Sequence, residues 1–254
     1  MELKEILEHH IIDHIYSWIK VAGFNIPFSK HVLMMFIVSF ILIFIFPVII
    51  NSKSKFLFPL RSVIEIILIF IRDEVVKPNL GHISYKYVPY FATLFFFILL
   101  MNLMGFVPFG ATATGNIAVT LGLAITTFIL INYAGIKEAG VLHYIKTFIP
   151  SGVPWWLYPV MIPIEIIGLF TKMFALAIRL FANMIAGHIV ILVFISFIFI
   201  FGAINVYVGL FIAAPFSVLL VLFVSMLEVL VAFLQAYIFT FLTAIFVSQA
   251  VSSH

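Results

Sequence analysis

Two long apolar runs occupy most of the second half of the chain, at 159–201 and 208–251. A helix of roughly forty residues extends about 60 Å, twice the hydrocarbon thickness of a bilayer. Because lipid leaves backbone polar groups unpaired, a chain crosses it only as helices or as a closed barrel. Each run is either a short two-helix hairpin or one strongly tilted helix. No turn signal lies within 164–201, so we expect two long tilted helices, joined by a turn at 202–205 into one hairpin.

Composition places the whole chain in the membrane. Hydrophobic residues make up 65% and charged residues 9% of the sequence, whereas soluble domains carry about 25% charged residues. The mean hydropathy of +1.30 agrees. This balance excludes a soluble enzyme, and the net charge of +3 is too small to favour a nucleic-acid partner. Cysteine is absent, and no nucleotide-binding glycine-rich loop is present, so we expect neither a metal site nor a cofactor.

The apolar pattern divides the chain into a polar, amphipathic N-terminal segment, 1–31, and a single membrane domain, 32–254. The N-terminal segment is acidic at its start, unlike a cleavable signal peptide. Charges flank a short apolar stretch between 56 and 76, which predicts a helix lying at the membrane interface. We therefore predict an all-α integral membrane protein with this interfacial helix and about five membrane-embedded helices, near 32–50, 88–107, 116–136, 159–201 and 208–251.

The distribution of Lys and Arg predicts the orientation. With five crossings, 51–87 and 137–158 lie on one side of the membrane and carry eight Lys and Arg residues. The opposite side holds 1–31 and the loop 108–115, with three lysines. Because loops on the cytoplasmic side carry an excess of positive charge, we expect the N-terminus outside and the C-terminus in the cytoplasm.

Arg179 lies in the middle of the first long run. A guanidinium stays charged inside proteins, and at the bilayer centre it costs roughly 2.5–3.5 kcal/mol on insertion scales. Such a charge faces a polar cavity or a partner, which makes an ion pathway the first hypothesis. Small and polar residues share its helical face, namely Glu165, Gly168, Lys172, Ala175, Ala182, Asn183 and Ala186. Small residues allow a second helix to approach, so we interpret this face as a docking surface. In the alternative, the charged side chains extend to the membrane surface and the small residues pack a static bundle.

The second long run carries one acid, Glu228, on a face shared with Ser217, Ser225, Ala232, Gln235 and Thr243. An ionised carboxylate is costly in apolar surroundings, so Glu228 is a candidate for reversible protonation. His188 titrates near neutrality and projects from the face opposite Arg179. If the two runs pack as a hairpin, His188 and Glu228 meet away from Arg179 and form a proton relay. The alternatives are a core histidine bonded to a neighbouring hydroxyl, and a helix-to-helix hydrogen bond for Gln235.

These residues resemble the a subunit of F-type ATP synthases. The resemblance rests on the string Arg-Leu-Phe-Ala-Asn-Met-Ile-Ala-Gly-His at 179–188, with Pro-Ile-Glu at 163–165 before it. Leu-Glu at 227–228 and Gln-Ala-Tyr-Ile-Phe-Thr at 235–240 extend it, as does Met-Asn-Leu-Met-Gly-Phe-Val-Pro at 101–108. It covers most of the chain from about residue 88 onward; the first 85 residues match only in layout.

The resemblance implies a stator beside a rotating ring of c-subunit hairpins, each with a membrane carboxylate. Arg179 would face the ring and separate two offset proton half-channels, with Asn183 and Gln235 beside that contact. Glu228 and His188 match the inlet pair, and Glu165 would belong to the cytoplasmic exit side. Lys172 is a secondary candidate for proton translocation. The chain would itself be no enzyme. Its partners would be the c-ring, b-type peripheral stalk subunits and the other synthase subunits, in a bacterial inner membrane or, alternatively, the mitochondrial one.

Two departures from some relatives concern the inlet. Enterobacterial relatives carry an acid at the position of His188 and a His at that of Glu228, so the pair is exchanged here. An exchange conserves the relay chemistry if the two side chains touch. Gly105 stands where some relatives carry an Asp, so Asn102 and Asn116 are the polar substitutes that the sequence offers.

Two other classes of membrane protein compete with this interpretation. A secondary transporter also carries charges within its helices, but it usually shows an inverted repeat and broken helices, and the sequence shows neither. A membrane anchor without an ion path has no use for Arg179, Glu228 and His188 together.

Overall fold

The computed structural model describes residues 15–21, 24–107, 112–141, 144 and 154–251. Within these residues, five helical segments are long and apolar enough to cross a membrane. The structure thus confirms an all-α membrane protein with five spanning helices. The segments are Lys30–Asn51, Phe58–Phe106, Ile117–Ala139, Tyr158–Ile204 and Val206–Val251.

The first span consists of α2 (Lys30–Phe40), a π-helical segment η1 (Ile41–Ile45) and α3 (Phe46–Asn51). Pro47 stands in the first turn of α3 and has no N–H to donate, so one helical hydrogen bond is missing just after the change of register. Two antiparallel strands, β1 (Ile15–Val21) and β2 (Phe24–Ser29), precede this span. The sequence pattern predicts no strand in this segment. Ser29 ends β2 and caps α2, its hydroxyl accepting from the Val32 amide at 3.4 Å.

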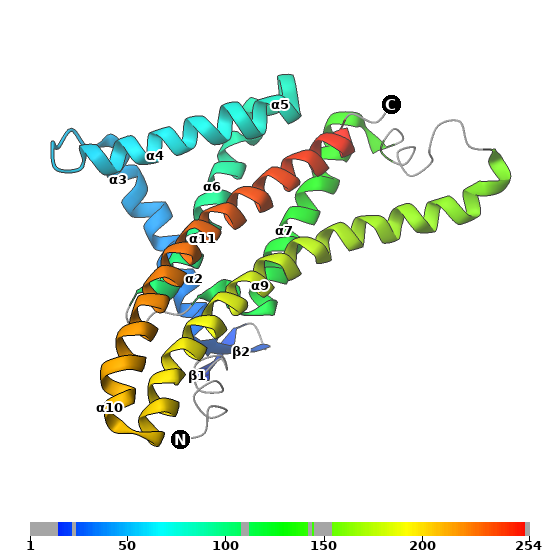
Figure 1. The fold of residues 1–254 in the computed structure, drawn as a ribbon. Helices are drawn as coiled ribbons and strands as arrows, with labels where there is room; N and C mark the ends of the chain where they lie inside the picture. The colour runs from blue at the N-terminus through cyan, green and yellow to red at the C-terminus, as the bar shows by residue number, and fades with distance from the viewer. Residues whose placement is uncertain (1–14, 22–23, 108–111, 142–143, 145–153, 252–254) are drawn as a thin grey trace.

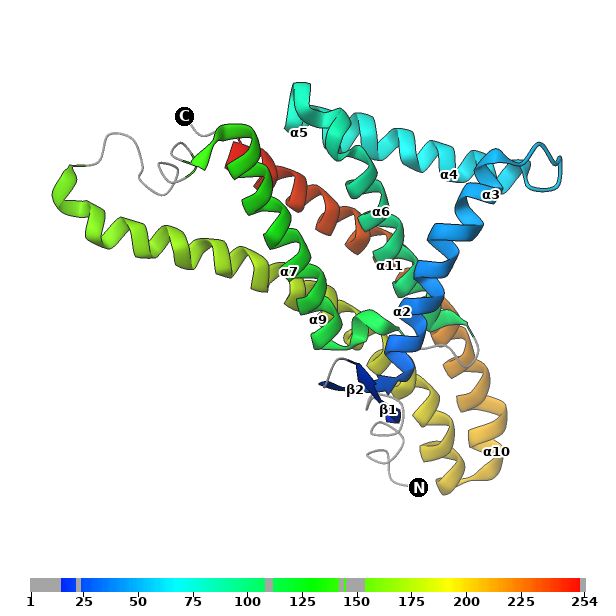
Figure 2. The ribbon, with the colours of Figure 1, turned by 180° about the vertical axis from the view of Figure 1, so that it is seen from behind.

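The next helical segment runs crosswise to the spans before it turns into the bundle (Figures 1 and 2). It comprises α4 (Phe58–Phe70), η2 (Ile71–Val76) and α5 (Lys77–Leu80). Gly81 has a φ of +52°, which favours glycine, and through η3 (Gly81–Ile83) it turns the chain into α6 (Ser84–Leu103). This crosswise segment is the helix predicted at 56–76, and it continues to Leu80. Its charges pair with one another, as in the 2.6 Å contact between Lys77 Nζ and Asp73 Oδ1.

The second and third spans are α6 and α7 (Ile117–Ala134). The short helices η4 (Met104–Phe106) and η5 (Ala113–Gly115) lie between them, and η6 (Gly135–Ala139) continues α7. Asn116 caps α7, because its side-chain oxygen accepts from the Ala118 amide at 2.9 Å.

The two long runs form the expected hairpin. After η7 (Trp155–Leu157), α9 (Tyr158–Ile204) runs unbroken for 47 residues. Then α10 (Val206–Val208), η8 (Gly209–Ala213) and α11 (Ala214–Val251) return beside it. The two helices lie side by side near the turn and diverge toward the other end, where α7 packs against both (Figures 1 and 2). The turn is shorter than the predicted 202–205, because α9 continues through Gly202 and only Asn205 is extended.

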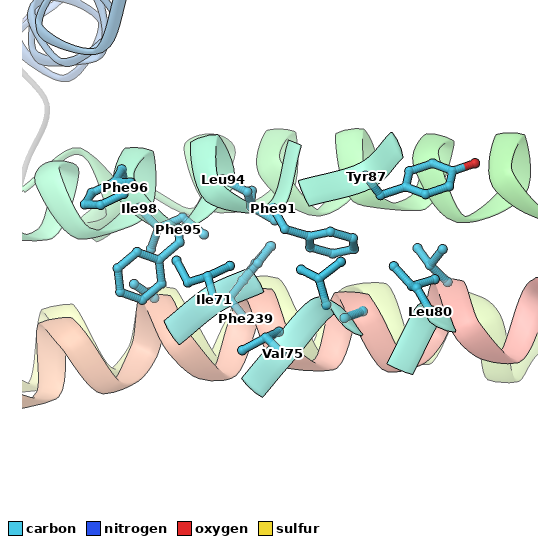
Figure 3. Packing of buried hydrophobic residues seen from close by; sticks show 14 of the residues in the cluster. Ile71, Val75, Leu80, Tyr87, Phe91, Leu94, Phe95, Phe96, Ile98 and Phe239 are labelled. Carbon is cyan, nitrogen blue, oxygen red and sulfur yellow. The ribbon is translucent and has the colours of Figure 1, made fainter. Parts of the chain in front are cut away.

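The largest apolar core holds α6, η2 and α11 together (Figure 3). Phe91 and Phe95 of α6 are fully buried, as are Ile71 and Val75 of η2, and Phe239 of α11 packs among them. Buried alanines on α11 let its backbone approach its neighbours closely. This core fixes α11, which carries the acid Glu228, relative to α6.

Candidate functional site

Arg179 lies on a face of α9 that the rest of the chain leaves open. Its side chain is partly exposed, and Ala175, Ala182 and Ala186 beside it are exposed. Among the described residues, no carboxylate pairs with the Arg179 guanidinium and no hydrogen bond to it is formed. A permanent charge on an apolar helix is therefore presented outward, flanked by residues too small to shield it.

His188 and Glu228 are in contact across the hairpin. His188 Nδ1 lies 2.6 Å from Glu228 Oε1, a distance typical of a strong charge-assisted hydrogen bond. The Glu228 residue is only 4% exposed, whereas the His188 ring is partly exposed. The second carboxylate oxygen, Oε2, is buried and has no hydrogen-bond partner among the described residues.

Gly187 permits this contact. A Cβ atom at position 187 would lie 2.7 Å from Glu228 Oε1 and 2.9 Å from its Cδ. Any larger residue would therefore displace the carboxylate from His188. The close approach of Glu228 thus explains why glycine stands at position 187, which the sequence pattern alone does not explain.

The other ring nitrogen of His188 contacts a residue that the sequence pattern does not indicate. His188 Nε2 lies 2.7 Å from Thr112 Oγ1, and Thr112 is 4% exposed. The histidine therefore has both contacts that were considered for it, a carboxylate and a neighbouring hydroxyl. Thr112 stands in a loop between α6 and α7, where no helical periodicity marks it, and only its nearness to turn residues could have drawn attention to it.

Asn102 anchors this loop to α11. Its Nδ2 donates to the Ala232 carbonyl at 3.2 Å, and its Oδ1 accepts from the Thr114 hydroxyl at 2.6 Å. Ala232 follows Glu228 by one helical turn, so the buried Asn102 ties the loop close to the acid. Asn116, the other polar substitute, instead caps α7.

The remaining predicted residues lie apart from this contact. Gln235 is buried on α11, and within the described part of the chain no hydrogen bond joins it to Arg179 or to the partly exposed Asn183. Lys172 donates to Gln249 Oε1 at 3.1 Å and lies over the Phe246 ring at 5.2 Å, which ties α9 to the end of α11.

Glu165 is partly exposed near the start of α9. It forms no ion pair with another described residue. Over the same described part of the chain, no group of three or more His, Asp and Glu side chains is arranged to hold a metal ion.

Comparison with known proteins shows the family to which the chain belongs. The family model described as "ATP synthase A chain" matches residues 32–248. The chain belongs to this family. Similar proteins include the ATP synthase subunit a 2 of Prosthecochloris aestuarii, 44% identical over 97% of this chain and 79% of the relative. The ATP synthase subunit a of Chlorobium phaeobacteroides strain DSM 266 is 45% identical over 98% and 75%. That of Myxococcus xanthus is 41% identical over 90% and 74%.

The chemistry available at the site suits proton movement in this family of membrane proteins. An imidazole placed between a carboxylate and a hydroxyl can accept a proton on one nitrogen and release one from the other. On the opposite face of the same helix, Arg179 supplies a fixed positive charge that forms no covalent bond. The site therefore combines a titratable pair with a permanent charge, in helices that are otherwise apolar.

Proposed function

We propose that this chain is the stator subunit of a rotary ATP synthase, with two proton half-channels beside a ring of c subunits. The observation that carries the proposal is the partly exposed Arg179 guanidinium, which has no ion-pair partner among the described residues and lies on a small-residue face of a 47-residue apolar helix. Membership of the ATP synthase A chain family supports it. A second helix that carries a carboxylate would fit this face and neutralise the charge.

Arg179 acts electrostatically in this proposal. A c-subunit carboxylate is costly in lipid when ionised, so it crosses the lipid protonated. Beside Arg179 the opposite charge favours the ionised form, and the carboxylate releases its proton. The guanidinium remains charged throughout and blocks direct passage of protons between the two half-channels.

His188 and Glu228 form the inlet from the outer side. Protons pass from this pair to the ring carboxylate, which then enters the lipid in its neutral form. Asn183 and Gln235 lie beside the ring contact, and Glu165 and Lys172 belong to the cytoplasmic exit. A membrane potential of 100 mV contributes about 2.3 kcal/mol for each charge that crosses, which biases the thermal motion of the ring in one direction.

The partners follow from this role. The c-ring docks on the open face of α9, b-type stalk subunits hold the chain against rotation, and nucleotide chemistry belongs to other subunits. The chain itself binds no cofactor and lies in a bacterial inner membrane, with its N-terminus outside.

Disulfide cross-linking tests the docking face directly. The chain has no native cysteine, so Ala182→Cys is paired with a cysteine placed beside the membrane carboxylate of a co-expressed c subunit. We expect fast, specific cross-linking. Cysteine at Ile191 is the matched control, because it lies nine residues along α9 and therefore on the face opposite Ala182. An assembled complex without the Ala182 cross-link would mean that this face does not meet the ring.

The first prediction concerns the charge itself. Arg179→Ala should abolish ATP-driven proton pumping while the complex still assembles, because nothing then separates the half-channels. The measurement is acidification of inverted vesicles. Arg72→Ala is the control, because Arg72 lies on the crosswise segment, away from α9. Its partner Asp73 would still pair with Lys77, so proton pumping should persist in this variant. Normal coupled pumping in Arg179→Ala would refute the stator proposal.

A further inference from the structure

His188 has a second polar neighbour besides Glu228, and three separate elements bring these three side chains together. Glu228 of α11 lies against Nδ1 of His188 on α9, and Thr112 of the α6–α7 loop lies 2.7 Å from Nε2. A threonine hydroxyl both donates and accepts a hydrogen bond. Thr112 is also nearly fully buried, so its hydroxyl is held at the ring rather than in bulk water.

Gly105 leaves the space that the Thr112 hydroxyl fills. A Cβ atom built at position 105 would overlap Thr112 Oγ1 and would lie 3.1 Å from His188 Nε2. One small volume beside the imidazole can therefore be filled from position 105 or from position 112, but not from both. In this chain the residue at 105 has no side chain, and Thr112 supplies the polar group.

The loop is held so that this hydroxyl stays in place. Asn102 bonds to the Ala232 carbonyl of α11 and to the Thr114 hydroxyl, two residues beyond Thr112. Both bonds are buried, where a broken hydrogen bond costs more than at the surface. Thr112 is thus fixed relative to α11 on one side and to α9 on the other.

We propose that Thr112 is the outermost side chain of the inlet relay, and that positions 105 and 112 share one polar slot beside His188. This inference rests on the proposed function. It assigns the hydroxyl a part in proton delivery, in addition to packing the loop.

The proton step balances without any further reagent. A proton that arrives on Thr112 Oγ1 lets the hydroxyl release its own proton to His188 Nε2. The imidazolium then releases the Nδ1 proton to Glu228 Oε1. One proton has entered at Thr112 and one has reached Glu228, and Thr112 is unchanged. His188 now carries its proton on Nε2 and must return it to Nδ1 before the next transfer.

Substitutions at Thr112 separate the hydroxyl from the shape of the side chain. In the reconstituted holoenzyme, Thr112→Ser keeps the hydroxyl, whereas Thr112→Val keeps the shape and loses it. We expect Thr112→Ser to pump protons near the wild-type rate. In Thr112→Val the pumping rate should fall about tenfold, which is the scale of one lost hydrogen bond to a charged group. The pH at which the passive proton conduction of stripped membranes is half-maximal should also shift in Thr112→Val. Wild-type rates and pH profile in Thr112→Val would overturn the relay role.

Position 105 tests the shared slot. Gly105→Asp alone should impair proton conduction, because the new side chain collides with Thr112. Adding Thr112→Ala should restore part of the loss, since the carboxylate then takes the vacated volume beside His188. A double variant no better than Gly105→Asp alone would refute the shared slot.

The variant Glu228→Gln distinguishes the Thr112 relay from the inlet pair itself. Loss of conduction in Glu228→Gln with normal conduction in Thr112→Val would sink this inference and leave the inlet pair standing. Normal conduction in Glu228→Gln would remove the inlet pair itself.

Discussion

At the scale of single residues, the proposed inlet depends on two glycines, which leave room for side chains from other elements. Gly187 lets the Glu228 carboxylate approach α9, and Gly105 lets the Thr112 hydroxyl approach the imidazole. His188 receives a polar neighbour on each ring nitrogen through these two gaps. Glycine carries a cost in helix stability of roughly 0.5–1 kcal/mol relative to alanine. At position 187 that cost is offset by a buried contact that no larger residue would allow.

Gly187→Ala should therefore lower proton conduction by about tenfold, the scale of losing a hydrogen bond to a charged group. The added Cβ lies 2.7 Å from Glu228 Oε1 and pushes the carboxylate off His188. Gly122→Ala on α7 is the matched control, because a Cβ there meets nothing within 4 Å. Passive conduction of stripped membranes measures both. Equal conduction in the two variants would show that the 2.6 Å contact does not limit the flux.

At the scale of elements, the hairpin turn depends on one close backbone approach. A Cβ on Gly209 would overlap Gly202 Cα and lie 2.7 Å from Gly202 N, whereas a Cβ on Gly202 meets nothing within 4 Å. Gly209→Ala should thus destabilise the fold by about 1–3 kcal/mol, the range for overpacking. Its thermal midpoint should fall by a few degrees. Gly202→Ala should hold or raise the midpoint, since it adds helix propensity.

Thermal unfolding of the detergent-solubilised complex decides between these outcomes. If Gly209→Ala and Gly202→Ala unfold at the same temperature, the close approach of η8 to α9 does not contribute to the stability of the hairpin.

The elements that the sequence predicted correctly are those set by length and hydropathy. The five spans follow from apolar runs long enough to cross a bilayer, and the unbroken α9 follows from the lack of turn residues within 164–201. The contact between His188 and Glu228 was expected from their places in a hairpin. The shortness of the hairpin turn was not expected. It arises because the side chain of Asn205 accepts a hydrogen bond from the Tyr207 amide, so that the next helix begins directly after Asn205.

Thr112 could not be predicted for a different reason. Helical periodicity ranks residues along one helix, whereas Thr112 acquires its neighbour only when the α6–α7 loop folds onto α9. The same holds for the steric roles of Gly105 and Gly187, which depend on atoms from another element. Contacts between residues of different elements therefore become visible only in the three-dimensional structure, even where the sequence predicts the elements themselves.

At the scale of the whole molecule, the chain leaves the two helical segments of its hairpin largely uncovered. Only 11% of the apolar window within Tyr158–Ile204 is buried, against 44% within Phe58–Phe106. The first long helix thus offers most of its surface to lipid or to another subunit. The crosswise segment and the end of α11 lie at one end of the molecule, and the hairpin turn lies at the other (Figures 1 and 2).

This polarity leads to a prediction of orientation. Ser54 lies in the lysine-rich loop before α4, and Tyr207, 74% exposed, lies at the hairpin turn. Because positive loops stay in the cytoplasm, Ser54→Cys should react with a membrane-impermeant maleimide only in inside-out vesicles. Tyr207→Cys should react only in right-side-out vesicles. Neither substitution alters a charge, and the chain has no cysteine of its own to react. Labelling of each position from the opposite side would invert the orientation, and His188 with Thr112 would then open to the cytoplasm and serve the exit path.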